Sequence, residues 1–216
     1  MKKASQSQIA YEYFKEMIIN RELLPGQQIV ESSFAEKLGI SRTPMREAIR
    51  ALEKDGLVHI IPNKGTYIVH FGQDEIIMGL EVAEALEGMI AFLVAERVVK
   101  DELTEDDFTP IEDIIQEMDD YLDQGDYKEW SVRDEELHVS LAELSGNTIL
   151  IEAFKKINMQ LNSVLWFVTS IHIDKSVSNE CHKKIFDAIK KGDMYKARVE
   201  AQDHRFKVRN ELLKIF

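Results

Sequence analysis

The stretch of sequence that decides the fold covers residues 24–69 and reads LPGQQIVESSFAEKLGISRTPMREAIRALEKDGLVHIIPNKGTYIV. A short helix is predicted over Ser32–Leu38, and Gly39 ends it. Another helix follows, which Ser41 or Thr43 can cap, because small polar side chains accept hydrogen bonds from the free amides of a first turn. The stretch therefore contains two helices joined by a turn of few residues.

Two strand patterns and one more helix surround this pair. Residues 57–61 and 66–69 are rich in β-branched and aromatic side chains, and the Pro-Asn-Lys-Gly turn at 62–65 suits a hairpin. Upstream, apolar residues recur at helical spacing over 9–18, before a turn at 24–26. Three helices followed by a two-stranded hairpin make a winged helix-turn-helix.

Beyond residue 72 the apolar periodicity is helical nearly to the end of the chain. Thr104 and Asp107 have the spacing of a capping box, and glycines mark most of the other turns. Six helices are predicted, over Asp74–Val99, Glu105–Asp123, Asp126–Leu144, Thr148–Ser170, Ser178–Lys191 and Asp193–Lys214. The fold class is therefore mainly α, with an N-terminal winged helix-turn-helix domain over residues 1–72 and an antiparallel all-α helical bundle over residues 73–216.

The net charge of −12 at first argues against a nucleic-acid partner, because DNA-binding proteins usually carry a basic excess. The charge is unevenly divided, however. Residues 1–70 hold 10 Lys/Arg and 8 Asp/Glu, whereas residues 71–216 hold 17 and 31. The objection therefore applies only to the second domain, whose acidity should help to confine phosphate contact to the first domain.

Composition also limits the class of protein. A hydrophobic content of 44% suits a globular chain with a core, and no stretch approaches 18 uninterrupted apolar residues, so no membrane span is expected. The single cysteine, Cys181, cannot form an internal disulfide, and the polar start of the chain does not resemble a signal peptide. Together these features favour a cytoplasmic protein.

A basic face is predicted on the third helix. Arg42, Arg46 and Arg50 are spaced four apart, so they project from one side of that helix. Guanidinium groups arranged in this way can bind guanine edges or phosphates in the major groove. Lys64 and Gly65 stand at the hairpin tip, where a thin basic wing can approach DNA. The alternative is a solvated face in which the arginines pair with neighbouring glutamates.

A second constellation lies in the bundle. Asp134 and His138 are four apart and share a helix face, while His182 lies 10 residues before Gly192 and His204 lies 12 residues after it. If the chain turns at Gly192 between antiparallel helices, the two later histidines stand at nearly the same height. One carboxylate and three imidazoles suit Zn²⁺, with Ni²⁺ or Mn²⁺ as alternatives. Hydrogen-bonded core histidines are the competing interpretation.

The first domain resembles the DNA-binding domain of GntR-type transcription regulators from about Tyr11 to Val69. The likeness rests on Pro25-Gly26, Ser41-Arg42-Thr43-Pro44, Arg46-Glu47-Ala48, Gly56-Leu57 and Gly65-Thr66. The resemblance implies that operator DNA is contacted by Arg42, Thr43 and Arg46, with the tip at Asn63, Lys64 and Gly65 entering the minor groove. Arg50 joins this set through its position on the helix face.

The second domain is similar to the FCD effector-binding domain of the FadR subfamily of these regulators, over about residues 74–213. The segments that carry the likeness are DEELHVSLAELSGN, ECHKKIFDAIKKGDMYKA and His204. The resemblance implies a metal bound by Asp134, His138, His182 and His204. One departure concerns Ala83, which stands where many members carry an arginine, the natural partner of a carboxylate ligand.

The sequence therefore predicts a DNA-binding transcription regulator, not an enzyme. Its operator affinity would be controlled by a small-molecule effector, a small organic acid, bound at the metal site. A homodimer on palindromic double-stranded DNA is expected, because one winged helix buries little surface and two-fold proteins read paired half-sites. Two alternatives stay open: a regulator for which the ion itself is the signal, and a metal-dependent enzyme.

Overall fold

The computed structural model describes residues 5–19, 22–70, 72–172 and 174–214, with the backbone alone over 162–172. The chain forms two compact units, one made mainly of residues before Gln73 and one made mainly of residues after it. None of the described helices is both long enough and apolar enough to cross a membrane.

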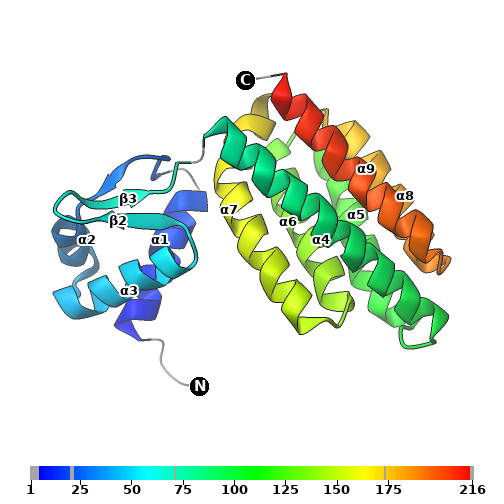
Figure 1. The fold of residues 1–216 in the computed structure, drawn as a ribbon, viewed down its shortest axis with the longest axis horizontal. Helices are drawn as coiled ribbons and strands as arrows, with labels where there is room; N and C mark the ends of the chain where they lie inside the picture. The colour runs from blue at the N-terminus through cyan, green and yellow to red at the C-terminus, as the bar shows by residue number, and fades with distance from the viewer. Residues whose placement is uncertain (1–4, 20–21, 71, 173, 215–216) are drawn as a thin grey trace. The chain divides into compact units, whose positions relative to one another are not determined.

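The first unit contains three helices and a small sheet (Figure 1). The helices are α1 (Gln6–Ile19), α2 (Glu31–Leu38) and α3 (Arg42–Lys54), and the strands are β1 (Gln28–Ile29), β2 (Val58–Ile61) and β3 (Gly65–Ile68). β2 and β3 form the predicted hairpin, with Val58 opposite Ile68 and Ile61 opposite Gly65. The predicted winged helix-turn-helix is confirmed.

Three local predictions for this unit need correction. The sheet has three strands in the order β1-β3-β2, because β1, which the sequence reading missed, pairs antiparallel with β3. α1 is described over Gln6–Ile19, and Glu22 is no longer helical, so the helix ends before the predicted turn at 24–26. Ser41 occupies the N-cap position of α3 but its side chain makes no capping hydrogen bond, and Thr43 lies inside the helix.

One face of α3 packs into the core of the first unit. Phe14, Met45 and Leu52 are fully buried in it. The Tyr11 hydroxyl donates a hydrogen bond of 2.7 Å to Asp55 Oδ2, which ties α1 to the end of α3. Burial, and next the hydrogen bond to Asp55, raise the pKa of Tyr11, so the phenol keeps its proton and remains a donor. The opposite face of α3 is left to solvent.

The second unit is a bundle of helices, as predicted (Figure 1). Its described helices are α4 (Gln73–Val99), α5 (Glu105–Gln124), α6 (Tyr127–Leu144), α7 (Thr148–His172), α8 (Lys175–Lys190) and α9 (Met194–Leu213). α4 and α9 lie side by side, and α8 packs against α9. The capping box of Thr104 and Asp107 is present at the start of α5.

The start of α8 differs from the prediction. The helix begins at Lys175, three residues before the expected Ser178, because Asp174 acts as its N-cap. The Asp174 carboxylate accepts a hydrogen bond of 3.0 Å from the backbone amide of Ser176.

The core of the bundle is aliphatic and aromatic along most of its length, with Val94, Ala142, Phe154 and Ile189 completely buried. A group of polar side chains interrupts it. These residues are almost fully buried and come from four helices: Glu87, His138, His182, His204 and Arg205.

Candidate DNA-reading face and metal centre

The predicted basic face of α3 is exposed. Arg42, Arg46 and Arg50 all point to solvent, while residues between them on the opposite side are buried. Within the part of the chain that the structure describes, none of the three arginines takes part in an ion pair. Glu53 is one of the neighbouring glutamates that could have paired with them, but its carboxylate accepts a hydrogen bond of 3.1 Å from the backbone amide of Ile60. The guanidinium groups are therefore available to an external anion.

The tip of the wing is held by its backbone while its side chains face solvent. Asn63 and Lys64 are exposed, and φ is +61° at Asn63 and +113° at Gly65. The carbonyl of Lys64 accepts hydrogen bonds from Gln28 Nε2 at 3.0 Å and from the Tyr67 hydroxyl at 3.1 Å. A Cβ at Gly65 would lie 2.7 Å from Gln28 Nε2, at the far end of a flexible side chain that can shift, so the backbone angle is the main reason for glycine there.

Thr43, the remaining residue of the predicted DNA-contacting set, is exposed in the first turn of α3. The structure thus leaves each residue of that set open to solvent, on α3 or at the wing tip. Gln28 was missed by sequence reasoning, since a two-residue strand carries too short a pattern to be recognised.

The three predicted histidines converge in the bundle. His138 comes from α6, His182 from α8 and His204 from α9, and one ligand atom of each lies within 4.8 Å of the others. The Nε2 atoms of His182 and His204 are 3.2 Å apart. The prediction that these two stand at the same height across the Gly192 turn is therefore confirmed.

Asp134 completes the cluster from α6. Its Oδ1 lies 3.5 Å from His182 Nε2 and 3.9 Å from His138 Nε2. Among the described atoms, Asp134 Oδ1 and His138 Nε2 are buried and make no hydrogen bond. A tetrahedral ion with bonds of about 2.0–2.1 Å to its ligands needs ligand atoms roughly 3.3 Å apart. The measured separations, and the two unsatisfied atoms, fit a divalent ion among these four residues.

The electrostatics of the cluster keep its three imidazoles in the form that binds a metal. Burial, followed by the charge of Arg205, lowers the pKa of His182 to about 3. Burial also lowers the pKa values of His138 and His204 well below the ordinary value for histidine. Burial raises the pKa of Asp134 to about 7, a shift that an adjacent dication would oppose. The imidazoles are thus neutral, which is the form that binds a metal.

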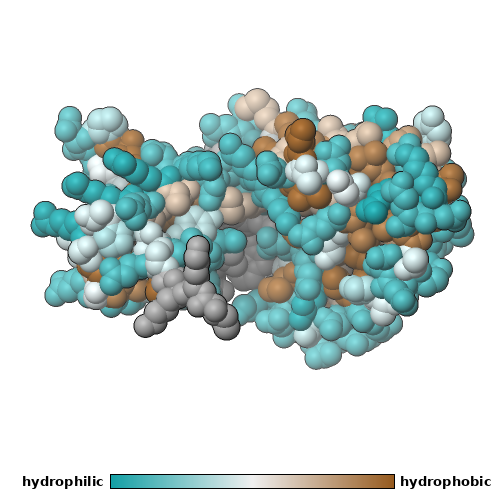
Figure 2. All heavy atoms as spheres, turned by 90° about the horizontal axis from the view of Figure 1, so that it is seen from below, coloured by the Kyte–Doolittle hydropathy of each residue, from teal (hydrophilic) through white to brown (hydrophobic). Residues whose placement is uncertain are grey.

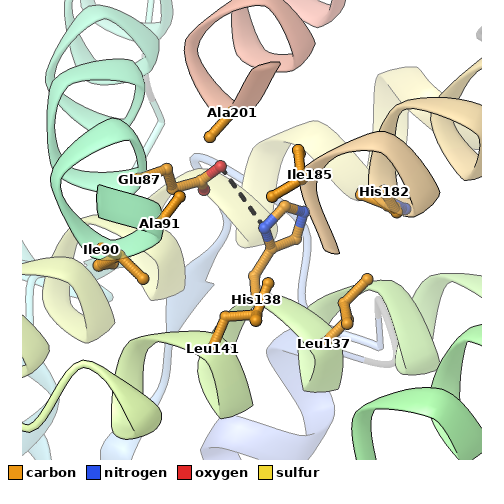
Figure 3. A pocket seen from close by; sticks show the side chains of 9 residues that line it. All are labelled: Glu87, Ile90, Ala91, Leu137, His138, Leu141, His182, Ile185 and Ala201. Atoms are coloured by element: carbon orange, nitrogen blue, oxygen red, sulfur yellow. Dashed lines mark ion pairs between the residues drawn. The ribbon is translucent and has the colours of Figure 1, made fainter. Parts of the chain in front are cut away.

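Beside the cluster is a buried ion pair that sequence reasoning did not identify. Arg205, in α9, contacts Glu87 Oε1, in α4, through Nε at 2.7 Å and Nη2 at 2.5 Å. The other oxygen, Oε2, lies 3.5 Å from Nδ1 of His138 (Figure 3). Burial raises the pKa of Glu87, and the charge of Arg205 opposes that shift. Ala83, which stands where the resemblance places an arginine, is buried one turn before Glu87. The guanidinium at this site is therefore that of Arg205 on α9, and not one from α4.

A small cavity adjoins the cluster. Glu87, His138 and His182 form its polar wall, and aliphatic side chains line the rest (Figure 3). The centre of a water molecule can occupy about 20 Å³ of it, which is room for one water or one ion. An organic acid could enter only if neighbouring side chains moved.

Two family models match the chain. The model of the bacterial regulatory proteins of the gntR family matches residues 6–68, and the FCD domain model matches residues 79–205, more than half of the chain. This protein belongs to the GntR family of transcription regulators and carries an FCD domain. The domains are those of a transcription regulator and not of an enzyme.

Relatives of this GntR regulator span most of its length. The uncharacterized HTH-type transcriptional regulator YdhC of Bacillus subtilis is 28% identical over 200 residues, which is 90% of this chain and 85% of that protein. An uncharacterized HTH-type transcriptional regulator in the TAR-I ttuE-ttuC' intergenic region of Agrobacterium vitis is 34% identical over 140 residues, covering 64% of this chain and 80% of the relative.

A solved structure shows the same fold. McbR/YncC of E. coli matches with a TM-score of 0.82 at 18% identity, covering 99% of each chain. This likeness supports the mainly α architecture of the GntR regulator described above.

Proposed function

We propose that this GntR regulator binds operator DNA through the α3 arginines and the wing tip, under the control of a small organic acid bound at a divalent metal ion. Asp134, His138, His182 and His204 would hold the ion. The observation that carries the proposal is the convergence of three histidines in the FCD domain, with Asp134 Oδ1 at 3.5 Å from His182 and 3.9 Å from His138. Two of these buried ligand atoms, Asp134 Oδ1 and His138 Nε2, make no hydrogen bond among the described atoms.

The donor set suits a borderline divalent ion. Three imidazole nitrogens and one carboxylate oxygen favour Zn²⁺, and Ni²⁺ and Mn²⁺ also accept such ligands. An ion that takes five or six ligands keeps positions beyond the four supplied by the protein, and a carboxylate could coordinate there. Effector binding would then bias the DNA-binding units through the bundle, which couples two distinct sites.

A second candidate is a regulator for which the ion itself is the signal. Three observations favour it: the cavity has room for about one water, Ala83 replaces an arginine expected from the resemblance, and Arg205 is already bound to Glu87. In a four-coordinate Zn²⁺ site, moreover, the protein ligands leave no position for an acid.

Metal content tests the site. We expect elemental analysis to find about one divalent ion per chain in the wild type, and a large loss in His182→Ala because one of the four ligands is gone. His59→Ala is the matched control, since His59 is an exposed histidine of the winged unit. Equal, negligible metal in all three proteins would contradict the proposal.

Gel shifts with operator DNA separate the two signals. If an acid is the effector, metal-loaded protein should change its operator affinity only when the acid found by a thermal-shift screen is added. If the ion is the signal, chelation alone should change the affinity, and adding the metal back should restore it. Operator affinity that responds to neither treatment would remove both candidates.

We also propose that the protein is a homodimer that reads a palindromic operator. The support is an apolar surface on α4, the α4 stripe, formed by the exposed residues Met78, Val82, Ala85 and Met89. Their spacing of four, three and four is that of a helix–helix seam. α9, which lies beside α4, exposes Tyr195, Val199 and Phe206. Figure 2 shows brown, apolar side chains at the surface of the second unit.

A further inference from the structure

The buried pair of Glu87 and Arg205 divides the two oxygens of one carboxylate between two partners. Both contacts from Arg205 go to Oε1, at 2.7 Å from Nε and 2.5 Å from Nη2. Oε2 is left facing Nδ1 of His138 at 3.5 Å (Figure 3). The carboxylate is thus fixed by a planar, rigid guanidinium, with its second oxygen aimed at one edge of the imidazole.

From this geometry we propose that Glu87 and Arg205 are positioning residues for His138. Glu87 accepts a hydrogen bond from Nδ1–H of His138, which leaves Nε2 unprotonated and turned toward the metal, and Arg205 holds Glu87 in place. The inference rests on the metal site proposed above and names the residues that orient one of its ligands.

The arrangement at both edges of the His138 ring supports this assignment. Nε2, on the edge toward Asp134, is buried and has no hydrogen bond among the described atoms. The carboxylate nearer to the ring is Glu87, at 3.5 Å from Nδ1, against 3.9 Å between Asp134 Oδ1 and Nε2. A neutral imidazole carries one proton, and the better acceptor decides which nitrogen holds it.

The consequence for metal binding follows from the position of that proton. A proton on Nε2 would have to be removed or moved before the nitrogen could bind an ion, whereas a proton on Nδ1 leaves Nε2 ready. Carboxylates that hold a ligating histidine in this way commonly change metal affinity 10- to 100-fold when they are removed. The role of Glu87 and Arg205 is therefore measurable without an effector or DNA.

The test variant removes both members of the pair together. Glu87→Met with Arg205→Met avoids leaving one buried charge without its partner, a change that would destabilise the bundle by itself. Arg209→Met is the matched control, because Arg209 also lies on α9 and pairs with α4 carboxylates, at 3.5 Å from Glu81 and 3.4 Å from Glu84. Circular dichroism and thermal melts of the metal-free proteins establish that each variant folds.

Two measurements decide the inference. In metal-free protein labelled with ¹⁵N-histidine, long-range proton–nitrogen NMR should show His138 protonated at Nδ1 in the wild type and in Arg209→Met. The double variant should gain the Nε2–H form. Competition with a chromophoric chelator for Zn²⁺ should show affinity about 10- to 100-fold weaker for the folded double variant, and unchanged for Arg209→Met.

Each failure has a distinct signature. Wild-type Zn²⁺ affinity and an unchanged His138 tautomer in the folded double variant would overturn the positioning role while leaving the metal site intact. An Nε2–H form of His138 in the wild type would overturn it as well. No Zn²⁺ binding by the wild type would overturn the metal site and this inference together. If the double variant does not fold, the wild-type tautomer alone decides.

Discussion

At the scale of single residues, the proposed DNA-reading face consists of a few guanidinium groups. Arg42, Arg46 and Arg50 are exposed in α3 and are not engaged in ion pairs within the described chain. An exposed arginine without an ion pair does not have to break an internal salt bridge before it contacts a base or a phosphate. Each guanidinium that binds a guanine edge through two hydrogen bonds contributes about 1–3 kcal/mol of discrimination.

Arg46→Ala should therefore weaken specific operator binding by about 1–3 kcal/mol, a 5- to 150-fold rise in Kd. A gel-shift titration at fixed salt measures it. Lys128→Ala is the control, because Lys128 is an exposed cation on α6 and not on the reading face. An operator affinity equal to that of wild type in Arg46→Ala would show that this side chain does not read the site.

At the scale of elements, the wing depends on a strand that contributes only two residues. β1 pairs with β3, and its Gln28 side chain donates to the carbonyl of Lys64 at the hairpin tip. Because Gln28 holds the backbone of the tip, it sets where the Lys64 ammonium stands without being part of the predicted contact set.

Gln28→Ala should lower operator affinity by a few fold while leaving the fold of the winged unit intact. The reason is that the tip loses one of the two hydrogen bonds to its Lys64 carbonyl, and Tyr67 keeps the other. Gel shifts give the affinity, and a thermal melt gives the stability. A loss of affinity as large as that of Lys64→Ala would mean that Gln28 contacts DNA directly.

The α4 stripe carries a prediction of the same scale. Val82→Glu places a charge in the centre of the proposed seam and should convert the dimer to a monomer, as measured by light scattering after gel filtration. Val132→Glu is a close control, since Val132 on α6 is 44% exposed and Val82 is 45% exposed. If both variants keep the wild-type mass, the dimer does not form through α4.

At the scale of the whole molecule, charge is divided unevenly between the unit proposed to bind DNA and the unit proposed to bind the metal ion. The first 70 residues are nearly neutral and the remainder is strongly acidic, so we expect the bundle to repel the phosphates that the basic face is proposed to bind. On the proposed function, affinity for DNA would rest on a small number of well-placed cations instead of on a broad positive surface.

The salt dependence of operator binding should accordingly be modest. If Arg42, Arg46, Arg50 and Lys64 supply the contacts, a dimer neutralises about eight phosphates at most, and the slope of log K against log salt is about −7 or shallower. Filter binding over a range of KCl concentrations measures the slope. A slope of about −10 or steeper would require further phosphate contacts and would contradict this account.

Much of the fold was predictable because it depends on the spacing of apolar and turn residues that are close together in the sequence. Apolar periodicity and turn residues indicated the helices, and the hairpin followed from its strand composition and its Pro-Asn-Lys-Gly turn. The ends of elements were less accurate. α8 starts at Lys175 because Asp174 caps it, whereas the sequence predicts a start at Ser178. Competing caps a few residues apart are nearly equal in free energy, so sequence alone does not choose between them.

The candidate metal centre was predictable for a related reason. Asp134 and His138 share a helix face, and His182 and His204 lie at similar distances from the turn at Gly192, so simple helix geometry brings them together. Their ligand role stays a prediction until metal content is measured.

The sequence by itself determined the two-part architecture and the residue types of both candidate sites, because each depends on spacings within one or two helices. Tertiary structure alone decided which groups surround the histidines. Arg205 and Glu87 meet although they are 118 residues apart, and Gln28 reaches the wing tip across 36 residues. Such pairs arise only when α4 packs on α9 or β1 joins β3. No local sequence pattern predicts these pairs, because the two partners are far apart in the sequence and come into contact only when the chain has folded.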